Sequence, residues 1–250
     1  MSAETIHHKK SVLITGASGG IGLSVIEYLI QQKNYDLYFQ VNKNKTTIID
    51  LLDKYDSPYS DRIFSIDITN EQQVEQMRNS IEARCESLWG LVNLVGISSN
   101  SMSWKLSTQE FMRILETNVL SAFLTCKAFV PSMRKKSQGR IINTSSVVAF
   151  KGTVGAAHYA ASKAAIIGFT KSISLELAEK NITANIIAPG FMDAGLIREI
   201  PGPALEIITQ QIPLKKLGQA SEVGHTISYL LNEQSSYITG QTFHINGGFY

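Results

Sequence analysis

Short apolar segments alternate along the chain with longer segments in which apolar residues recur every three or four positions. The short segments are rich in Val, Ile, Leu and Phe, which is typical of strands buried on both faces. They predict strands at Ser11–Thr15, Asp36–Val41, Arg62–Ile66, Trp89–Val95, Arg140–Asn143, Thr183–Ala188 and Gln241–Ile245. The longer segments have the period of an amphipathic helix. They predict helices close to Ile21–Leu29, Thr46–Tyr55, Glu71–Cys85, Thr108–Lys136, Tyr159–Lys180 and Ser221–Leu231.

The alternation of strands and helices favours an α/β fold with a parallel sheet covered on both faces. Crossovers between the strands should be right-handed. No internal repeat, low-complexity tract or linker divides the chain, so we predict a single doubly wound domain over residues 1–250 with a mostly parallel, seven-stranded sheet. In such sheets ligands bind beyond the carboxyl ends of the strands, which makes the residues after each strand the candidates for function.

Composition narrows the possible partners. The 250 residues carry a formal net charge of +2, so the sequence indicates neither a nucleic-acid nor a membrane partner. Two cysteines cannot form a disulfide framework or a structural zinc site, and we expect no metal. The first ten residues lack the apolar segment of a signal peptide, and no stretch is long and apolar enough to span a membrane. The expected compartment is the cytoplasm.

A glycine-rich turn, Thr15–Gly22, follows the first predicted strand and opens the first predicted helix. Glycine permits a tight turn and a close approach of the backbone to phosphate oxygens, and a helix N-terminus attracts an anion. The turn has glycines at 16, 20 and 22, and it lacks the Gly-Lys-Ser/Thr of a nucleoside-triphosphate-binding loop. It therefore predicts a dinucleotide pyrophosphate bound by Thr15, Gly16, Ser18, Gly20, Ile21 and Gly22.

The second predicted strand is followed by a segment with no acidic residue that could bind a ribose 2′-hydroxyl. The segment contains Asn42, Lys43 and Lys45, and a basic side chain there suits a 2′-phosphate. We therefore expect NADP(H) rather than NAD(H), with simple solvation of the two lysines as the alternative. Asp67 directly follows the third predicted strand and could accept from the adenine amino group, although it could equally have a structural role next to the N-cap of the next helix. Ile68 beside it is a further expected cofactor contact.

Tyr159 and Lys163 lie four positions apart on a predicted helix, so their side chains share one face about one turn apart. A nearby ammonium favours a phenolate and lowers the pKa of tyrosine from about 10 toward the range of acid–base catalysis. Ser146 follows the fifth predicted strand, where its hydroxyl could hold a carbonyl oxygen, and Asn118 could hold a water that extends a proton path. Each residue alone is compatible with an ordinary structural role. Together, downstream of a dinucleotide-binding turn, they predict a catalytic site.

Over nearly its whole length the chain resembles the short-chain dehydrogenase/reductase family. The resemblance rests on the turn Thr15–Gly22, on Ser146, Tyr159 and Lys163 with their spacing, and on Asn118. It implies a Rossmann-type fold with helices on both faces and a nicotinamide dinucleotide as cofactor. The further cofactor contacts that it implies are Asn93, Gly96, Tyr159, Lys163, Pro189, Gly190 and Met192, with the Pro-Gly turn above the nicotinamide.

Within the family, the segments Gly139–Val148 and Tyr237–Gly248 are most similar to those of 3-oxoacyl-(acyl-carrier-protein) reductases. This similarity implies NADPH-dependent reduction of a carrier-bound 3-oxoacyl thioester to the 3-hydroxyacyl form by a homotetramer, in fatty-acid or a related polyketide- or polyene-type biosynthesis. Two alternatives stay open. One is a reductase or dehydrogenase of a small free alcohol, sugar or ketone, and the other is a dinucleotide-binding protein without catalysis.

Three positions depart from the family pattern. Leu94 replaces the second amide of the family's Asn-Asn-Ala-Gly motif, which should change the packing behind the cofactor. Gly19 stands where many NADP-dependent members have Arg or Lys. No threonine follows Pro189–Gly190, so we expect weaker cofactor affinity or a contact from elsewhere in that loop.

The segments Ile97–Leu106 and Phe191–Ile212 follow the fourth and sixth predicted strands and are the expected walls of a substrate site. The region 190–213 is the expected movable lid. Met102 and Trp104 could line an acyl or aryl channel, and Trp104 could equally lie at the surface or in an oligomer contact. Basic residues at the ends of two predicted helices either complement the helix dipoles or form a docking patch for an acidic carrier protein. They are Arg134, Lys135, Lys136 and Lys180.

Overall fold

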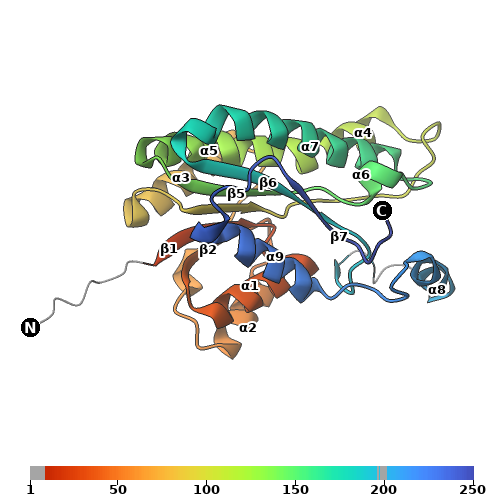
Figure 1. Cartoon of the computed structure of the whole chain (residues 1–250), viewed down its shortest axis with the longest axis horizontal. Coiled ribbons are helices and arrows are strands. Elements are labelled where there is room, and N and C mark those ends of the chain that lie inside the picture. Colours follow the sequence, from red (N-terminus) through yellow and green to blue (C-terminus); the bar gives the residue numbers. More distant parts are fainter. Residues whose placement is uncertain (1–8, 196, 198–201) are drawn as a thin grey trace, which may run out of the picture.

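A seven-stranded parallel sheet lies at the centre of the molecule, in the order β3-β2-β1-β4-β5-β6-β7 (Figure 1). The computed structural model describes residues 9–195, 197 and 202–250. The strands are β1 (Lys10–Thr15), β2 (Tyr35–Val41), β3 (Ile63–Ser65), β4 (Gly90–Asn93), β5 (Gly139–Thr144), β6 (Ile182–Pro189) and β7 (Thr242–Ile245). The predicted α/β class and parallel sheet are confirmed.

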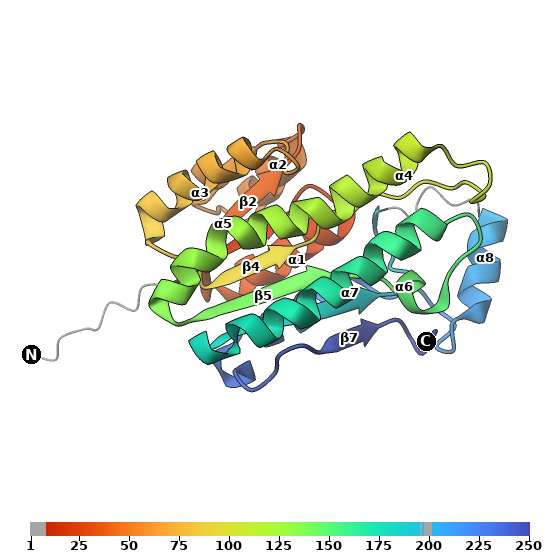
Figure 2. The same cartoon turned by 90° about the horizontal axis from the view of Figure 1, so that it is seen from above.

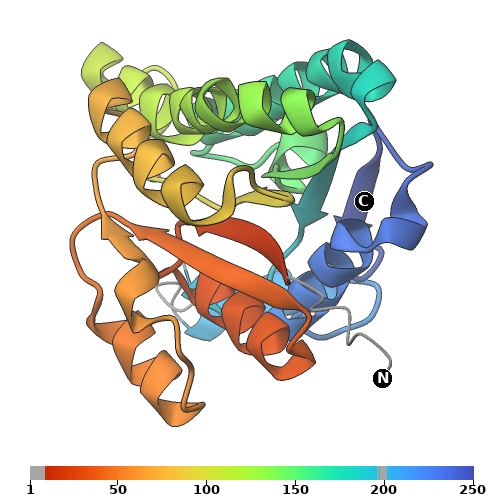
Figure 3. The ribbon, with the colours of Figure 1, turned by 90° about the vertical axis from the view of Figure 1, so that its left-hand side faces the viewer.

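Helices cover both faces of this sheet (Figure 3). On one face lie α1 (Gly20–Gln32), α2 (Thr46–Lys54) and α9 (Ala220–Leu231), and on the other lie α3 (Glu71–Cys85), α5 (Ser121–Lys136) and α7 (Ala157–Leu177). Three further helices lie toward the carboxyl edge of the sheet: α4 (Thr108–Leu115), α6 (Val148–Lys151) and α8 (Gly202–Gln211). None of the helices in the described ranges is long and apolar enough to cross a membrane.

The central strand β1 shows why its sequence is apolar without alternation. Val12 and Ile14 belong to the core cluster that includes residues of α1 and α9, whereas Leu13 belongs to the cluster that includes residues of α3, α5 and α7. Successive side chains of a strand point to opposite faces, and here both faces are covered. A continuous apolar strand is therefore the sequence signature of this two-sided burial.

The strand order places a ligand site at the carboxyl edge beside β1. β1 pairs with β2 on one side and with β4 on the other, and Thr15 is opposite Asn93. Because the chain returns from β3 across β1 to β4, the connections after β1 and β4 leave the sheet in opposite directions. The glycine turn 15–22 and the segment 97–106 thus begin side by side.

The predicted helix Thr108–Lys136 is interrupted in the structure. α4 is followed by a five-residue π-helix, Glu116–Leu120, and only then by α5. The predicted helix is confirmed in its bounds, because the three segments follow one another without a gap, and only the π-helical turn at its centre was not predicted. The predicted lid 190–213 contains α8, which the sequence analysis did not identify, and residues 196 and 198–201 of that lid lie outside the described residues.

Candidate active site

Ser146, Tyr159 and Lys163 meet at the carboxyl edge, where α7 lies over β5 and β6 (Figure 2). Ser146 follows β5, and the Val148 backbone N–H at the start of α6 donates to Ser146 Oγ at 3.3 Å. Tyr159 stands in the first turn of α7, and its hydroxyl is hydrogen-bonded to Ser146. The two hydroxyls can therefore hold one substrate oxygen between them.

Lys163 lies one turn further along α7 and is only 2% exposed. Its ammonium donates to the Thr144 carbonyl at 2.9 Å and lies 5.8 Å from the centre of the Tyr159 ring. A Cβ at Gly96 would lie 2.9 Å from Lys163 Nζ, so a side chain at position 96 would displace the ammonium. The structure places the lysine and the tyrosine as neighbours, as predicted.

The predicted electrostatics of this pair is wrong in one respect. Burial raises the pKa of Tyr159 above its ordinary value, and the hydrogen bond with Ser146 offsets only part of that rise. Burial also lowers the pKa of Lys163, to about 8. Low-dielectric surroundings disfavour both charged forms, so the desolvation of the phenolate outweighs the attraction of the ammonium. In the protein alone the phenol keeps its proton at neutral pH, which suits a proton donor.

Asn118 lies in the π-helix, and both the oxygen and the nitrogen of its side-chain amide are hydrogen-bonded within the protein. Its Oδ1 accepts from the Ile97 N–H at 2.8 Å, and its Nδ2 donates to the Ile97 carbonyl at 2.9 Å and to Ser162 Oγ at 3.0 Å. Both amide hydrogens are thus used, and one lone pair of Oδ1 remains for a water. The observed role of Asn118 is to fix Ile97 against α7, and its predicted role in a water relay stays a prediction.

The glycine turn has the shape that a pyrophosphate requires. Gly16 has φ +65°, and a Cβ there would lie 2.9 Å from Val95 N. A Cβ at Gly20 would lie 2.3 Å from Gly195 N, so the loop after β6 packs directly on the turn. The first turn of α1 has no side-chain cap, which leaves its N–H groups to a bound anion. The chemistry of these donors fits the phosphates of a dinucleotide.

Gln40, in β2, supports this turn, and the sequence analysis did not identify it. Its buried side chain accepts from the Gly16 N–H at 3.1 Å and donates to the Ile66 carbonyl at 3.0 Å. Gln40 therefore braces the turn against the end of β3. A glutamine within an otherwise apolar strand was the available signal, since buried amides require partners.

The residues predicted to bind the adenosine end of the cofactor differ in how accessible their side chains are. Lys43 and Lys45 are both exposed beyond the end of β2. Asp67 Oδ1 accepts from the Thr69 N–H at 2.9 Å and from the Thr69 hydroxyl at 2.7 Å, which is the structural interpretation left open above. Ile68 is buried. The lysines are thus accessible to a phosphate, and Asp67 already shapes the turn before α3.

Thr15 and Asn93 direct their side chains into the protein. Asn93 Oδ1 accepts from the Thr15 hydroxyl at 3.3 Å and from the Thr125 hydroxyl at 2.9 Å. Asn93 Nδ2 donates to Asn143 Oδ1 at 2.9 Å. This buried network ties the ends of β1, β4 and β5 together. A cofactor contact from Thr15 or Asn93 is therefore left to their backbone groups.

The Pro189–Gly190 turn is tied to the catalytic segment. The Val147 N–H, next to Ser146, donates to the Pro189 carbonyl at 3.0 Å, and the Gly190 N–H donates to the Ile245 carbonyl at 2.9 Å. Met192 is buried and pairs with Gly218. The turn after β6 thus stands beside Ser146. In the part of the chain that the structure describes, no cluster of three His, Cys, Asp or Glu residues could hold a metal ion.

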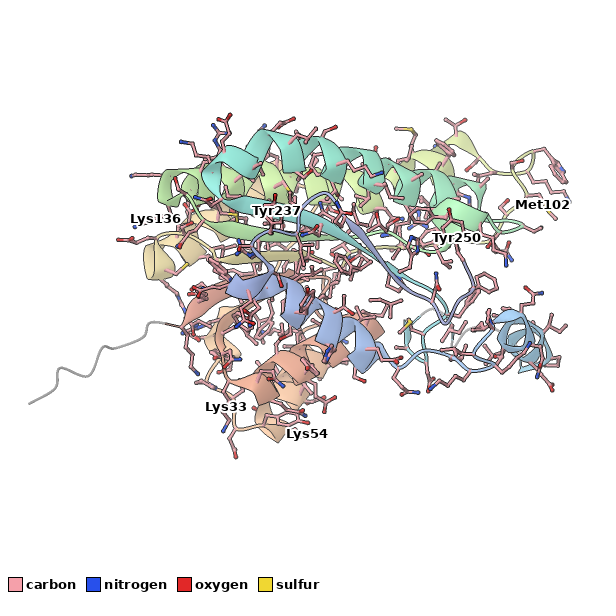
Figure 4. All side chains as sticks on the ribbon, viewed as in Figure 1. Lys33, Lys54, Met102, Lys136, Tyr237 and Tyr250 are labelled. Carbon is pink, nitrogen blue, oxygen red and sulfur yellow. The ribbon has the colours of Figure 1, made fainter. Side chains whose placement is uncertain are left out.

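The four predicted docking residues lie at the opposite edge of the sheet. Arg134, Lys135 and Lys136 form the last turn of α5, and Lys180 precedes β6. α5 alone spans about 24 Å at 1.5 Å per residue, which separates this basic end from Asn118. Lys136 and Met102 mark the two ends in Figure 4. Lys136 is also paired with Glu86. A carrier docked on these residues would not sit at this chain's own catalytic edge.

Comparison with known proteins agrees with this geometry. Residues 16–250 match a family model described as enoyl-(acyl carrier protein) reductase. The chain is 35% identical to the 3-oxoacyl-(acyl-carrier-protein) reductases FabG of Salmonella typhimurium, over 242 residues, and of Escherichia coli, over 244 residues; each match covers 96% of this chain and 97% of the relative. The chain belongs to the short-chain dehydrogenase/reductase family.

The family places the site described above in a known chemical context. Nodulation protein G of Rhizobium sp. (strain N33) is a further relative, 34% identical over 241 residues, which are 96% of either chain. As a member of the short-chain dehydrogenase/reductase family, the protein is an oxidoreductase that uses a nicotinamide dinucleotide. The glycine turn fits the cofactor phosphates, and the Ser146–Tyr159 pair fits the substrate oxygen.

Proposed function

We propose that the protein reduces the ketone of a 3-oxoacyl thioester, held on an acyl carrier protein, to the 3-hydroxyacyl form with NADPH. The observation that carries the proposal is the pairing of the Tyr159 hydroxyl with Ser146, next to buried Lys163, at the edge where the glycine turn begins. The relatives named 3-oxoacyl-(acyl-carrier-protein) reductase support the substrate class, since they match nearly the full length of the chain.

The residues divide the chemistry as follows. The dihydronicotinamide, when bound, supplies the hydride that reaches C3 of the substrate. Ser146 Oγ and Tyr159 Oη donate hydrogen bonds to the ketone oxygen and orient the carbonyl. As negative charge develops on the ketone oxygen, Tyr159 transfers its proton to that oxygen and is left as a phenolate. Lys163 stabilises this phenolate, because its buried ammonium lies 5.8 Å from the centre of the Tyr159 ring.

We further propose NADP(H) as the preferred cofactor. The segment after β2 offers two exposed ammonium groups, Lys43 and Lys45, and no carboxylate. A 2′-phosphate carries negative charge that these lysines would attract, whereas the segment has no carboxylate to bind a free 2′-hydroxyl. This supports NADPH over NADH.

A homotetramer is also part of the proposal, with an exposed apolar face as its support. Leu120, Phe123 and Leu175, on the π-helix, α5 and α7, are 36%, 44% and 80% exposed. The ring of Phe123 lies against Phe169 of α7, so the two helices form one surface. Light scattering should give about four times the 27.5 kDa of the chain.

Such an assembly would give the basic patch a role that one chain alone does not. A two-fold axis perpendicular to α5 would pack the helix antiparallel to its copy. The basic ends of α5 and α7 would then lie beside the catalytic edge of the partner. Docking of an acidic carrier through Arg134, Lys135, Lys136 and Lys180 would therefore serve the neighbouring site.

The cytoplasm stays the predicted compartment for this reaction.

Tyr159→Phe tests the proposed reaction. The variant keeps the ring but removes the proton donor, so kcat for NADPH-dependent reduction of acetoacetyl-carrier protein should fall about 10³-fold. The dissociation constant of NADPH should stay within about twofold, because the ring still fills the same space. Tyr237→Phe, at a fully exposed tyrosine, is the control and should leave kcat unchanged.

The substrate panel decides between this proposal and its competitors. It contains the acetoacetyl thioesters of carrier protein and coenzyme A, a free ketone, and a trans-2-enoyl thioester. The proposal expects the highest kcat/KM on the carrier-bound ketone. A preference for the free ketone, reduction of the enoyl double bond instead, or substantial kcat in Tyr159→Phe would contradict it.

A further inference from the structure

A chain of hydrogen bonds outside the catalytic group links α4 to the first turn of α7. Ser99 Oγ lies 2.9 Å from His158 Nε2, and the same hydroxyl is hydrogen-bonded to the carboxylate of Glu110. Arg113 donates two hydrogen bonds of 2.7 Å to that carboxylate. His158 is completely buried, directly before Tyr159. The chain therefore runs from the surface into the helix that carries the catalytic tyrosine.

The direction of each hydrogen bond follows from the charges. The hydrogen bonds from Arg113 and Ser99 hold the pKa of Glu110 at about 2, so the group is a carboxylate at neutral pH and can only accept. Ser99 must donate its hydroxyl hydrogen to Glu110, and its oxygen must accept from His158. The ring nitrogen of His158 that faces Ser99 therefore carries a hydrogen. The buried Nδ1 of His158 has no partner among the described residues, so the bond to Ser99 is what orients the ring.

Ser99 lies in a loop that is attached to α7 at several points. Asn118 holds both backbone groups of Ile97, and it also bonds Ser162 of α7. The Ser101 N–H donates to the Gly155 carbonyl, just before α7, at 2.9 Å. His158 provides the attachment between these two. The path of the loop is therefore set by α7, the same element that carries Tyr159 and Lys163.

The loop carries bulky apolar side chains beyond these attachments. Met102 and Trp104 are 39% and 76% exposed. Figure 4 shows Met102 at the side of the molecule toward which the carboxyl ends of the strands point. Apolar groups exposed near a catalytic edge are suited to contact an alkyl chain. A loop held at Ser99 presents them at a fixed distance from the Tyr159 hydroxyl, whereas a released loop would not.

We propose that Glu110, Ser99 and His158 form a clamp that fixes the loop Ile97–Leu106 relative to Tyr159. His158 is a positioning residue in this clamp: it does not touch the reacting atoms, but it sets where the acyl chain binds. The inference rests on the proposed function, because it takes this loop as a wall of the acyl-chain site.

Four variants separate the clamp from a general role in packing. His158→Leu fills a similar volume without a donor, and Ser99→Ala removes the central hydroxyl at a less buried position. His158→Gln keeps an N–H that can reach Ser99 and should rescue the clamp. Glu75→Gln is the control outside the clamp, at a carboxylate on α3 that pairs with Arg78 three residues later.

The first readout is amide hydrogen exchange of the protein without ligands. Loss of one hydrogen bond should speed exchange of the Ser101 amide about tenfold in His158→Leu and Ser99→Ala. His158→Gln and Glu75→Gln should exchange at the wild-type rate. Unchanged exchange in both His158→Leu and Ser99→Ala would overturn the clamp, whatever the protein's reaction is.

The second readout is steady-state kinetics with a 3-oxoacyl thioester. KM should rise about tenfold in His158→Leu and Ser99→Ala, while kcat and the dissociation constant of NADPH stay within about twofold. Faster exchange with an unchanged KM would overturn the positioning role of His158. A wild-type protein inactive on all 3-oxoacyl thioesters would instead overturn the proposed function, and the exchange rates would still decide the clamp.

Discussion

Strand β5 has a buried cation at each end, and the two differ in what burial does to them. At the amino end, the guanidinium of Arg140 lies 4.5 Å from the centre of the Trp89 ring and donates to the Gly139 carbonyl. At the carboxyl end, Lys163 donates to the Thr144 carbonyl. Among the described residues, neither cation forms an ion pair with a carboxylate.

The difference lies in the chemistry of the two cations. Burial lowers the pKa of both groups. Arginine starts above 12 and stays charged, so Arg140 can only be a structural cation. Lysine starts near 10.4, and burial brings Lys163 to about 8, where its charge responds to its surroundings. The cation at the catalytic edge can therefore change its protonation state because it is a lysine, whereas the cation at the other edge is permanently charged because it is an arginine.

Lys163→Met should give the largest contrast between the two ends. Without the ammonium, the Tyr159 phenolate has no stabilising charge, and kcat should fall at least about 100-fold. The protein should nevertheless become more stable at neutral pH. Keeping Lys163 charged in the fold costs about 3 kcal/mol, which the variant no longer loses. This gain in stability should exceed the cost of leaving the Thr144 carbonyl without its hydrogen-bond donor.

The pH dependence gives the sign of this cost. The unfolded chain holds the Lys163 proton more tightly than the native protein, so the wild-type free energy of unfolding should rise from about pH 8 to pH 10 through this group. Lys163→Met should lack that rise in urea unfolding at several pH values. A variant less stable than the wild type at pH 7 would contradict the account.

Exposed lysines sharpen the comparison, because their charge carries no burial cost. Replacing Lys43 and Lys45 together by Ala should raise KM for NADPH about tenfold and leave KM for NADH unchanged. The discrimination should shrink as salt is added, since exposed charges are screened. Equal effects on the two cofactors would exclude a 2′-phosphate contact.

Arg140→Lys should have the smallest effect, confined to stability. The ammonium keeps the charge but loses the planar contact with Trp89, so the free energy of unfolding should fall by about 1–2 kcal/mol. The rate constant kcat should not change, because the site lies at the other end of β5. A fall in kcat comparable to that of Lys163→Met would show that the two ends are not independent.

Much of the fold follows from pattern alone. Alternating apolar segments predict the seven strands, because burial on both faces leaves an unbroken apolar signal, as in Val12, Leu13 and Ile14. The π-helix around Asn118 was not predicted, because the extra residue of a π-turn shifts the apolar pattern by only one position, which is hard to recognise in a single sequence. The four-residue helix α6 was not predicted either; the Ser146 hydroxyl, two residues before it, accepts from the Val148 N–H.

The candidate site was predictable in its membership but not in its electrostatics. Spacing places Tyr159 beside Lys163, but it does not give their burial, and burial decides the direction of both pKa values. Supporting contacts such as that of Gln40 with Gly16 link residues far apart in sequence. Those contacts follow from tertiary structure, which no local pattern encodes.

Titration of Lys163 by NMR tests the central claim most directly. With ¹³C-labelled lysine, the Cε resonance of the Lys163 side chain can be assigned by its absence in Lys163→Met. The account predicts a pKa of about 8 for this group in the protein without ligands. A Lys163 pKa of 10 or higher would contradict it, because the ammonium would then be solvated rather than buried at the catalytic edge.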